Sequence, residues 1–286
     1  MGLHKPPQGA RIRIPDEGVF NMEYVSRIVG SVVVLVCVMA GIMYESWAWN
    51  IVASVIAIGS LAELYRLMST KYRLSRGWGL SGAVLMLAAV SMRSSFSLLL
   101  VILAIVAMLV LFTEVVRRQS MGHSYALFNL GGTLAGLIYV VLPWCFTILM
   151  RMRPDGQMYL LTIFFCTWSC DVGAYIVGTS LGSTHLCDRV SPHKTLEGFI
   201  AGVVSSTVCG SILPVVFGIE PFPWVILGAL CGVAGQLGDL AESVLKREAG
   251  VKDTGHAIPG HGGFLDRFDS ILINATLIFF IIEIIS

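Results

Sequence analysis

The chain has 286 residues, of which 56% are hydrophobic and only 13% are charged. Soluble domains carry about 25% charged residues, so this composition excludes an ordinary soluble protein and indicates an all-α, polytopic integral membrane protein. The formal net charge of +1 gives no support to nucleic-acid binding, which depends on strong or clustered positive charge.

The first predicted element is a polar N-terminal arm over residues 1–27, with three prolines among its first fifteen residues. Prolines disfavour a stable helix at its start. Arg11 and Arg13 are suited to contact anionic lipid headgroups, and a solvated tail without a role is an equally good interpretation. We expect the rest of the chain, residues 28–286, to form a single helical membrane domain.

Nine apolar segments follow the arm, most of them near the roughly 20 residues that a helix needs to cross a bilayer. They lie at residues 28–44, 48–68, 78–92, 95–113, 127–149, 158–178, 198–217, 222–245 and 264–285. The third is short and contains glycine, so an interfacial position is an alternative for it. The sequence therefore predicts about nine transmembrane helices.

The basic residues orient these segments. With nine spans, the N-terminal arm and every second loop share one side of the membrane, and they hold all but three of the 19 lysines and arginines. Arg93, Arg151 and Arg153 remain for the other side. Because loops rich in lysine and arginine stay in the cytoplasm, we expect a cytoplasmic N-terminus and a cytoplasmic position for two polar loops, at residues 179–197 and 246–265.

Ionisable residues inside predicted spans are candidates for function, because charge is costly within a membrane. Glu63 and Arg66 lie three residues apart, and we expect them to pair locally or to reach the headgroups. Asp171 lies well inside the sixth segment and shares a predicted helix face with Tyr175 and Gly178. Asp171 either forms a polar bridge between helices or takes part in a functional site, and the sequence favours neither alternative.

A polar stripe ends the eighth segment. Asp239, Glu242, Ser243 and Lys246 recur with the helical period and therefore share one face. A single acid at this place would be a helix cap or an ion-pair partner. Two carboxylates, a hydroxyl and an amine that lead into a charged loop indicate a site.

The polar loop at residues 179–197 has a turn signal at Ser191-Pro192 and a helix start near Thr195, with Glu197 in the first helical turn. Lys194 lies just before that helix, where free backbone N–H groups favour an anion. The loop has no Walker A pattern, so it indicates phosphate binding only through this placement of Lys194.

The second polar loop carries more chemistry. Its glycines at 260, 262 and 263 can expose consecutive backbone donors. Asp266 and Asp269, three residues apart, place two carboxylates on one helix face, and with Asp239 they supply the oxygen ligands that Mg²⁺ prefers. The basic residues between them suit phosphate oxygens. This inventory predicts phosphoryl or nucleotidyl transfer, and an ion-pair network at the membrane surface is the alternative.

The same stretch resembles the signature of the CDP-diacylglycerol synthases, also called phosphatidate cytidylyltransferases. The matching positions are Ser243-x-x-Lys246-Arg247, Lys252-Asp253 and Pro259-x-His261-Gly262-Gly263-x-x-Asp266-Arg267-x-Asp269. Two stretches upstream are also similar to motifs of the family: Asp171-x-x-Ala174-Tyr175-x-x-Gly178 and Ser191-Pro192-x-Lys194-Thr195-x-Glu197-Gly198. Ser183 and Leu196 depart from the residues common in the family, a base and a tryptophan. The first five segments resemble the family only in being apolar, and no motif of the family matches there.

The resemblance implies transfer of CMP from CTP to phosphatidic acid, which gives CDP-diacylglycerol and pyrophosphate, with Mg²⁺ as the metal and a second ion as an option. The predicted catalytic residues are Lys246, Arg247, Lys252, His261 and Arg267. Substrate binding is assigned to Ser191, Lys194, Glu197, Ser243, Gly262 and Gly263. Metal binding is assigned to Asp239, Asp266 and Asp269, with Asp171, Glu242 and Asp253 as further candidates. The expected partners are CTP, phosphatidic acid in the bilayer and, as an option, a second copy of the chain.

The expected location is a bacterial inner membrane, with an organelle membrane as the alternative, and the site is expected to face the cytoplasm. Two rival functions remain. A CTP-dependent lipid kinase, or a cytidylyltransferase for another lipid, would use the same inventory. A transporter would use Asp171, Asp239 and Glu242 as an ion path, but it would be expected to show inverted repeats, and no repeat is visible in the sequence.

Overall fold

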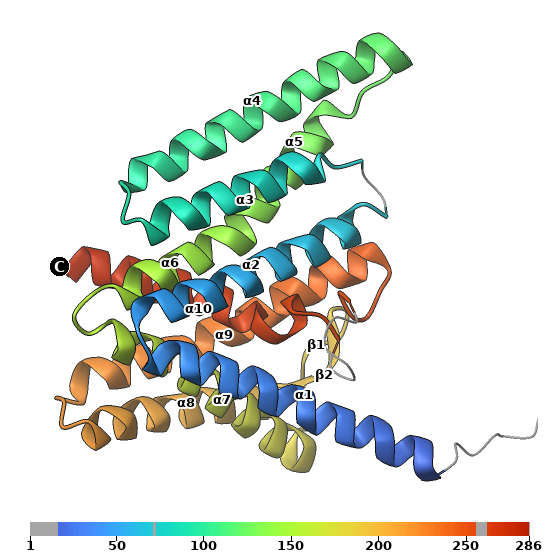
Figure 1. Ribbon diagram of the computed structural model, residues 1–286. Helices are drawn as coiled ribbons and strands as arrows, with labels where there is room; N and C mark the ends of the chain where they lie inside the picture. The colour runs from blue at the N-terminus through green and yellow to red at the C-terminus, as the bar shows by residue number, and fades with distance from the viewer. Residues whose placement is uncertain (1–16, 71–72, 256–261, 286) are drawn as a thin grey trace, which may run out of the picture.

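The computed structural model describes residues 17–70, 73–255 and 262–285 (Figure 1). Its helices are α1 (Glu17–Met43), α2 (Ser46–Met68), α3 (Arg76–Ser91), α4 (Phe96–Met121), α5 (Ala126–Gly136), the π-helical turn η1 (Leu137–Val141), α6 (Leu142–Arg151), α7 (Gly156–Leu181), α8 (Leu196–Val216), α9 (Phe222–Ala249) and α10 (Leu265–Ile285). Two strands, β1 (His185–Cys187) and β2 (Ser191–Thr195), form one antiparallel hairpin. Because α5, η1 and α6 are continuous, the described residues form nine helical rods.

Each rod corresponds to one predicted segment, so the all-α, polytopic prediction is confirmed. Within the described ranges, six rods are long and apolar enough to cross a membrane, namely α2, α4, the α5–α6 rod, α7, α8 and α9. Helix α3 has 16 residues, a length of about 24 Å at 1.5 Å per residue. It is therefore shorter than the roughly 30 Å of a hydrocarbon core.

Two helix bounds differ from the predicted spans. Helix α1 already begins at Glu17, ahead of the predicted start at residue 28, and residues 1–16 of the predicted arm lie outside the described residues. Helix α4 continues past residue 113 to Met121 and ends where Gly122 takes a left-handed conformation, φ 76°. Both extensions are polar in part, so hydropathy alone does not detect them.

A cluster of aromatic side chains fixes α10 against three other helices. Trp49 of α2, Trp144 of α6, Phe164 of α7 and Phe268 of α10 are all buried. Their rings contact one another, with centroids 5.4 Å apart between Trp144 and Phe268 and 5.7 Å apart between Trp49 and Phe164. Contacts of this geometry are favourable beyond the area that they bury. They hold the first turns of α10 in place, immediately beside Asp269.

Small residues allow α8, α9 and α10 to approach closely. A Cβ atom at Gly228 of α9 would lie 3.0 Å from the Cα atom of Gly210 in α8. A Cβ atom at Gly238 would lie 3.0 Å from the carbonyl oxygen of Asp269 in α10. The second contact lies next to Asp239, so it brings the polar stripe of α9 (Asp239, Glu242, Ser243 and Lys246) beside the carboxylates of α10.

Candidate active site

The predicted site residues that the structure describes gather at one end of the bundle, where α7 and α9 end and α8 and α10 begin (Figure 1). The first polar loop contains the β1–β2 hairpin, and Arg247 at the end of α9 donates from Nε to the carbonyl oxygen of Val190 in that hairpin, 3.2 Å away. The two polar loops are therefore in direct contact, although about 60 residues separate them along the chain.

Lys194 connects the hairpin to the α9 stripe. Its Nζ atom lies 2.7 Å from Oδ2 of Asp239, and Oδ1 of Asp239 accepts a hydrogen bond of 3.5 Å from Ser243. Thr195 caps α8, because its hydroxyl accepts from the backbone N–H of Gly198 at 3.2 Å. Lys194 thus lies immediately before a helix N-terminus, as predicted, and its charge is directed at a carboxylate.

Lys246 lies among carboxylates that outnumber it. Its Nζ atom is 3.0 Å from Oδ1 of Asp266 and 3.4 Å from Oε2 of Glu242. Glu242 is fully buried, and neither of its carboxylate oxygens accepts a hydrogen bond from a residue in the described ranges. The carboxyl groups of Glu242 and Asp269 interact directly, and Asp269 is itself 8% exposed. Buried charge of this kind needs a cation or a proton beyond what Lys246 alone supplies.

Asp266 holds the second polar loop. Its Oδ2 atom accepts hydrogen bonds from the backbone N–H groups of Gly263 (2.8 Å) and Thr254 (2.9 Å) and from the Thr254 hydroxyl (2.9 Å). Gly262 has φ 84°, and a Cβ atom there would lie 2.8 Å from Asp266 Oδ2. The glycine pair therefore serves the close approach of the loop to Asp266, and the N–H of Gly263 is directed at this carboxylate.

The fit of these residues to Mg²⁺ depends on how many of them reach one point. Within the described residues, no three histidine, cysteine or acidic side chains are grouped closely enough to hold a metal by themselves. The predicted trio of Asp239, Asp266 and Asp269 is therefore not a preformed cage in that part of the chain. Protein-bound Mg²⁺ usually takes one or two carboxylates and completes its coordination with water and substrate phosphates. Asp239, Asp269 and the unsatisfied oxygens of Glu242 fit that mode.

Two adjoining cavities share Asp171 and Asp239 in their walls. The first, about 520 Å³, is lined by Gly30, Ser31, Val34 and Leu35 of α1, by Thr167 and Trp168 of α7, and by Lys246, Asp266, Arg267, Phe268, Asp269 and Ser270. The second, about 790 Å³, lies against the hairpin and includes Tyr175, Gly178, His185, His193, Lys194 and Gln236. Asp171, Tyr175 and Gly178 thus face one cavity, as their spacing predicts.

Other predicted residues lie at the edge of this region. Glu197 accepts hydrogen bonds from the Ser183 hydroxyl (2.6 Å) and from the N–H of Thr184 (3.1 Å), so it fixes the turn that follows α7. Arg247 donates to backbone carbonyls, as described above for Val190. Ser191 forms part of β2 and pairs with Cys187.

Three predicted residues of the second polar loop remain. Lys252 and Asp253 are exposed. His261 lies outside the described residues.

Residues that the sequence reasoning missed come mainly from the first helices. Of the two options for Glu63 and Arg66, local pairing is not what the structure shows, because Glu63 is buried at 4% exposure and accepts a 2.9 Å hydrogen bond from the N–H of Leu265, whereas Arg66 is exposed. The signal was present as a carboxylate within an apolar span. Its partner lies about 200 residues away, so the spacing pattern does not reveal it.

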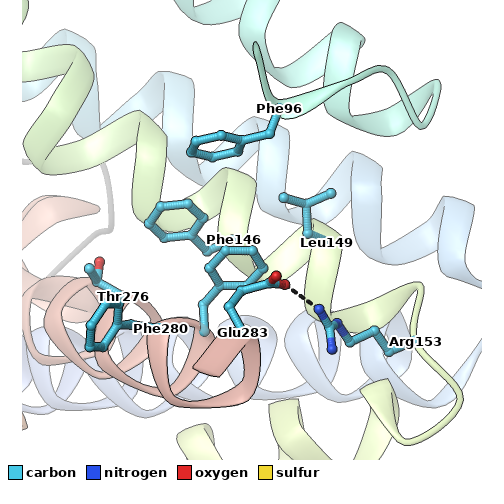
Figure 2. A pocket seen from close by; sticks show the side chains of 8 residues that line it. Phe96, Phe146, Leu149, Arg153, Thr276, Phe280 and Glu283 are labelled. Atoms are coloured by element: carbon cyan, nitrogen blue, oxygen red, sulfur yellow. Dashed lines mark hydrogen bonds and ion pairs between the residues drawn. The ribbon is translucent and has the colours of Figure 1, made fainter. Parts of the chain in front are cut away.

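A third cavity, about 580 Å³, lies at the opposite end of α10 (Figure 2). Figure 2 shows aromatic side chains around it and an ion pair between Arg153 and Glu283 at its rim. Its wall consists of Phe96, Phe146, Leu149, Arg153, Thr276, Phe279, Phe280 and Glu283. None of these residues belongs to the predicted site.

Comparison with known proteins identifies the family of the chain. The sequence model of the "Cytidylyltransferase family" matches residues 25–285. The phosphatidate cytidylyltransferase of Bacillus subtilis is 38% identical over 190 residues, which cover 64% of this chain and 68% of that protein. The phosphatidate cytidylyltransferase of Synechocystis is 44% identical over 139 residues, which cover 46% of this chain. That of Staphylococcus haemolyticus is 44% identical over 126 residues, which cover 42% of this chain. These two matches span about half the length of those relatives, 45% and 47%.

Proposed function

The chain belongs to the cytidylyltransferase family, and from that premise we propose that this multi-pass membrane protein is a phosphatidate cytidylyltransferase. It transfers CMP from CTP to phosphatidic acid and produces CDP-diacylglycerol and pyrophosphate. The observation that carries this proposal is the pair of cavities that meet at Asp171 and Asp239 beside a cluster of carboxylates and lysines. Two substrates that react with each other need two binding spaces with a common wall.

The linings favour one substrate for each cavity. The cavity at the hairpin has His185, His193 and Lys194, polar groups suited to a nucleoside triphosphate. The other cavity has Val34 and Leu35 of α1 on one side and Lys246 and Arg267 on the other. A lipid with an anionic headgroup matches that combination of apolar and cationic walls.

The reaction needs little proton transfer. An ionised oxygen of the lipid phosphate attacks the α-phosphorus of CTP, the bond from that phosphorus to the bridging oxygen breaks, and pyrophosphate leaves with the bonding electrons. Lys194, Lys246 and Arg267 offset the negative charge that accumulates on the phosphate oxygens. Because the attacking phosphate oxygen is already ionised, no strong general base is required.

We propose Mg²⁺ as the cofactor, held by Asp239 and Asp269 with Glu242 beside them. The unsatisfied buried oxygens of Glu242 support this assignment. When bound, the ion supplies electrostatic stabilisation of the triphosphate. Asp266 serves mainly to order the loop at residues 246–265, and Arg247 and Glu197 hold the two polar loops in position.

The orientation is also a proposal. We infer a cytoplasmic N-terminus, with the catalytic loops 179–197 and 246–265 of one membrane domain at the cytoplasmic face of a bacterial inner membrane, from the distribution of lysine and arginine. Reporter fusions test it: a fusion at residue 255 should report the cytoplasm and a fusion at residue 286 the outside. A homodimer stays a prediction, tested by the mass of the purified protein in detergent.

The decisive experiment uses purified protein with CTP, phosphatidic acid and Mg²⁺. We expect release of pyrophosphate, and label from α-labelled CTP in the lipid product. Label from γ-labelled CTP in the lipid would instead identify a lipid kinase. Ion flux in proteoliposomes without turnover of CTP would identify a transporter.

A further inference from the structure

Glu63 of α2 reaches across the bundle to the second polar loop. Its Oε2 atom accepts a 2.9 Å hydrogen bond from the N–H of Leu265, the first residue of α10, and lies 3.4 Å from the hydroxyl of Thr254. The first N–H groups of a helix have no partner within the helix and need an acceptor. Such an acceptor usually comes from a neighbouring residue in the sequence, whereas here it comes from another helix.

The loop is built closely around this carboxylate. A Cβ atom at Gly263 would lie 2.3 Å from Glu63 Oε2, and one at Gly255 would lie 2.9 Å from Glu63 Oε1. Atoms cannot approach so closely, so both positions require glycine for as long as Glu63 occupies this place. The described ends of the loop, on either side of residues 256–261, therefore both contact one side chain.

Thr254 extends the contact into the candidate active site. Its hydroxyl lies between Glu63 Oε2 at 3.4 Å and Asp266 Oδ2 at 2.9 Å, and Asp266 in turn contacts Lys246. A hydroxyl has one hydrogen and can donate to only one of the two carboxylates at a time. The position of Glu63 therefore affects the position of Asp266 and, through Asp266, that of Lys246.

We propose that Glu63 is a positioning residue for cytidylyl transfer, which fixes the start of α10 and Thr254 so that Asp266 and Lys246 keep their geometry. This inference rests on the proposed function. It assigns a role in catalysis to α2, outside the part of the chain that carries the signature. The alternative is that Glu63 stabilises the fold without affecting the site.

Glu114 provides a matched control for that alternative. It is also a buried glutamate, at 2% exposure against 4% for Glu63. It likewise accepts from the backbone of a later segment, the N–H of Tyr125 at 2.8 Å, and also bonds Asn129 and Arg117. These partners are all in α4, α5 and the loop between them, so within the described part of the chain Glu114 has no hydrogen bond to the second polar loop.

The test compares Glu63→Ala, Glu63→Gln and Glu114→Ala in the full-length protein in detergent, with CTP, phosphatidic acid and Mg²⁺. We expect kcat of Glu63→Ala to fall about 100-fold, because small displacements of catalytic groups cost on this order. We expect KM for CTP to change less than about threefold, since Glu63 binds no substrate. Glu63→Gln should recover kcat to within about tenfold of the wild type, because its amide oxygen can still accept from Leu265 and Thr254.

Two further readouts separate positioning from general stability. Glu114→Ala should lower the thermal midpoint about as much as Glu63→Ala but keep kcat within about threefold of the wild type, since it does not contact the site. Hydrogen exchange of the backbone at residues 254–255 and 263–265 should rise in Glu63→Ala and not in Glu114→Ala. Equal loss of kcat in the two alanine variants, or unchanged exchange at residues 254–255 and 263–265 in Glu63→Ala, would overturn the inference.

Failure of the proposed function gives a different result. In that case the wild-type protein itself does not turn over CTP, whereas hydrogen exchange still reports whether Glu63 holds the loop. Should Glu63→Ala fail to fold, Thr254→Val replaces it, because it removes the hydroxyl between the two carboxylates and leaves Glu63 unchanged. Its kcat should fall about tenfold, and wild-type kcat in Thr254→Val would count against the inference.

Discussion

The two ends of α10 carry cavities of similar size, about 520 Å³ near Asp269 and about 580 Å³ near Glu283. Asp269 and Glu283 are 14 positions apart, which corresponds to about 21 Å along the helix. At the first end, Glu242 and Asp266 both contact the amine of Lys246, and the buried carboxyl group of Asp269 lies beside them. At the second end, Arg153 and Glu283 form an ion pair that is partly exposed, beside the stacked rings of Phe146 and Phe279.

The two ends therefore differ in charge balance and not in cavity volume, and we use charge balance to identify the active site. A matched ion pair with access to water contributes little and needs no further partner. Buried carboxylates in excess of their cations need one more cation, and a nucleotide-metal complex would supply it. The comparison predicts large effects of substitutions at the first end and small effects at the second.

The largest effect is expected for Asp269→Asn. It removes one buried negative charge from the set that we assign to Mg²⁺ and retains the size of the side chain. Formation of CDP-diacylglycerol should fall about 1000-fold or more, on the scale of losing a central electrostatic group. The assay is product formation by protein whose thermal midpoint in detergent is close to that of the wild type. Near-normal turnover would exclude Asp269 from metal binding.

Lys246→Met should have the next largest effect. It leaves Glu242 and Asp266 without their shared cation, so the free energy of unfolding should fall by about 3 kcal/mol. Turnover should fall about 100-fold, because a charge that faces the phosphates is lost. Thermal unfolding and initial rates on the same preparation measure both quantities. Unchanged stability would show that the two carboxylates do not depend on Lys246.

Val34→Trp tests the assignment of the cavity beside α1 to the lipid. A larger side chain reduces the space between α1 and the carboxylate cluster. KM for phosphatidic acid should rise about tenfold, while KM for CTP stays within about twofold of the wild type. Steady-state rates with each substrate varied in turn provide the measurement. A rise in KM for CTP alone would reverse the assignment of the two cavities.

The smallest effect is expected for Glu283→Gln, at the aromatic end. It breaks a partly exposed ion pair with Arg153. Stability should change by less than about 1 kcal/mol, and turnover should stay within about twofold of the wild type, since the residue lies far from the reacting atoms. A loss of activity comparable to that of Lys246→Met would remove the distinction between the two ends of α10.

Much of this architecture follows from the sequence alone. The length of the apolar segments predicts nine helical rods, because the bilayer demands apolar side chains over a set distance. Helical periodicity brings Asp239, Ser243 and Lys246 to one face. The signature of the second polar loop identifies the family before any fold is known.

Only the tertiary structure decides which distant residues meet. The pairing of Lys194 with Asp239, the capping of α10 by Glu63 and the contribution of α1 to a cavity all join segments separated by tens to hundreds of residues. Local spacing determines which side chains share a helix face, because that depends on backbone geometry alone. Which faces meet depends on how all the helices pack together, through contacts such as Gly210 against Gly228 and Trp144 against Phe268. Such contacts depend on the shapes of both partners, so no single stretch of sequence contains them.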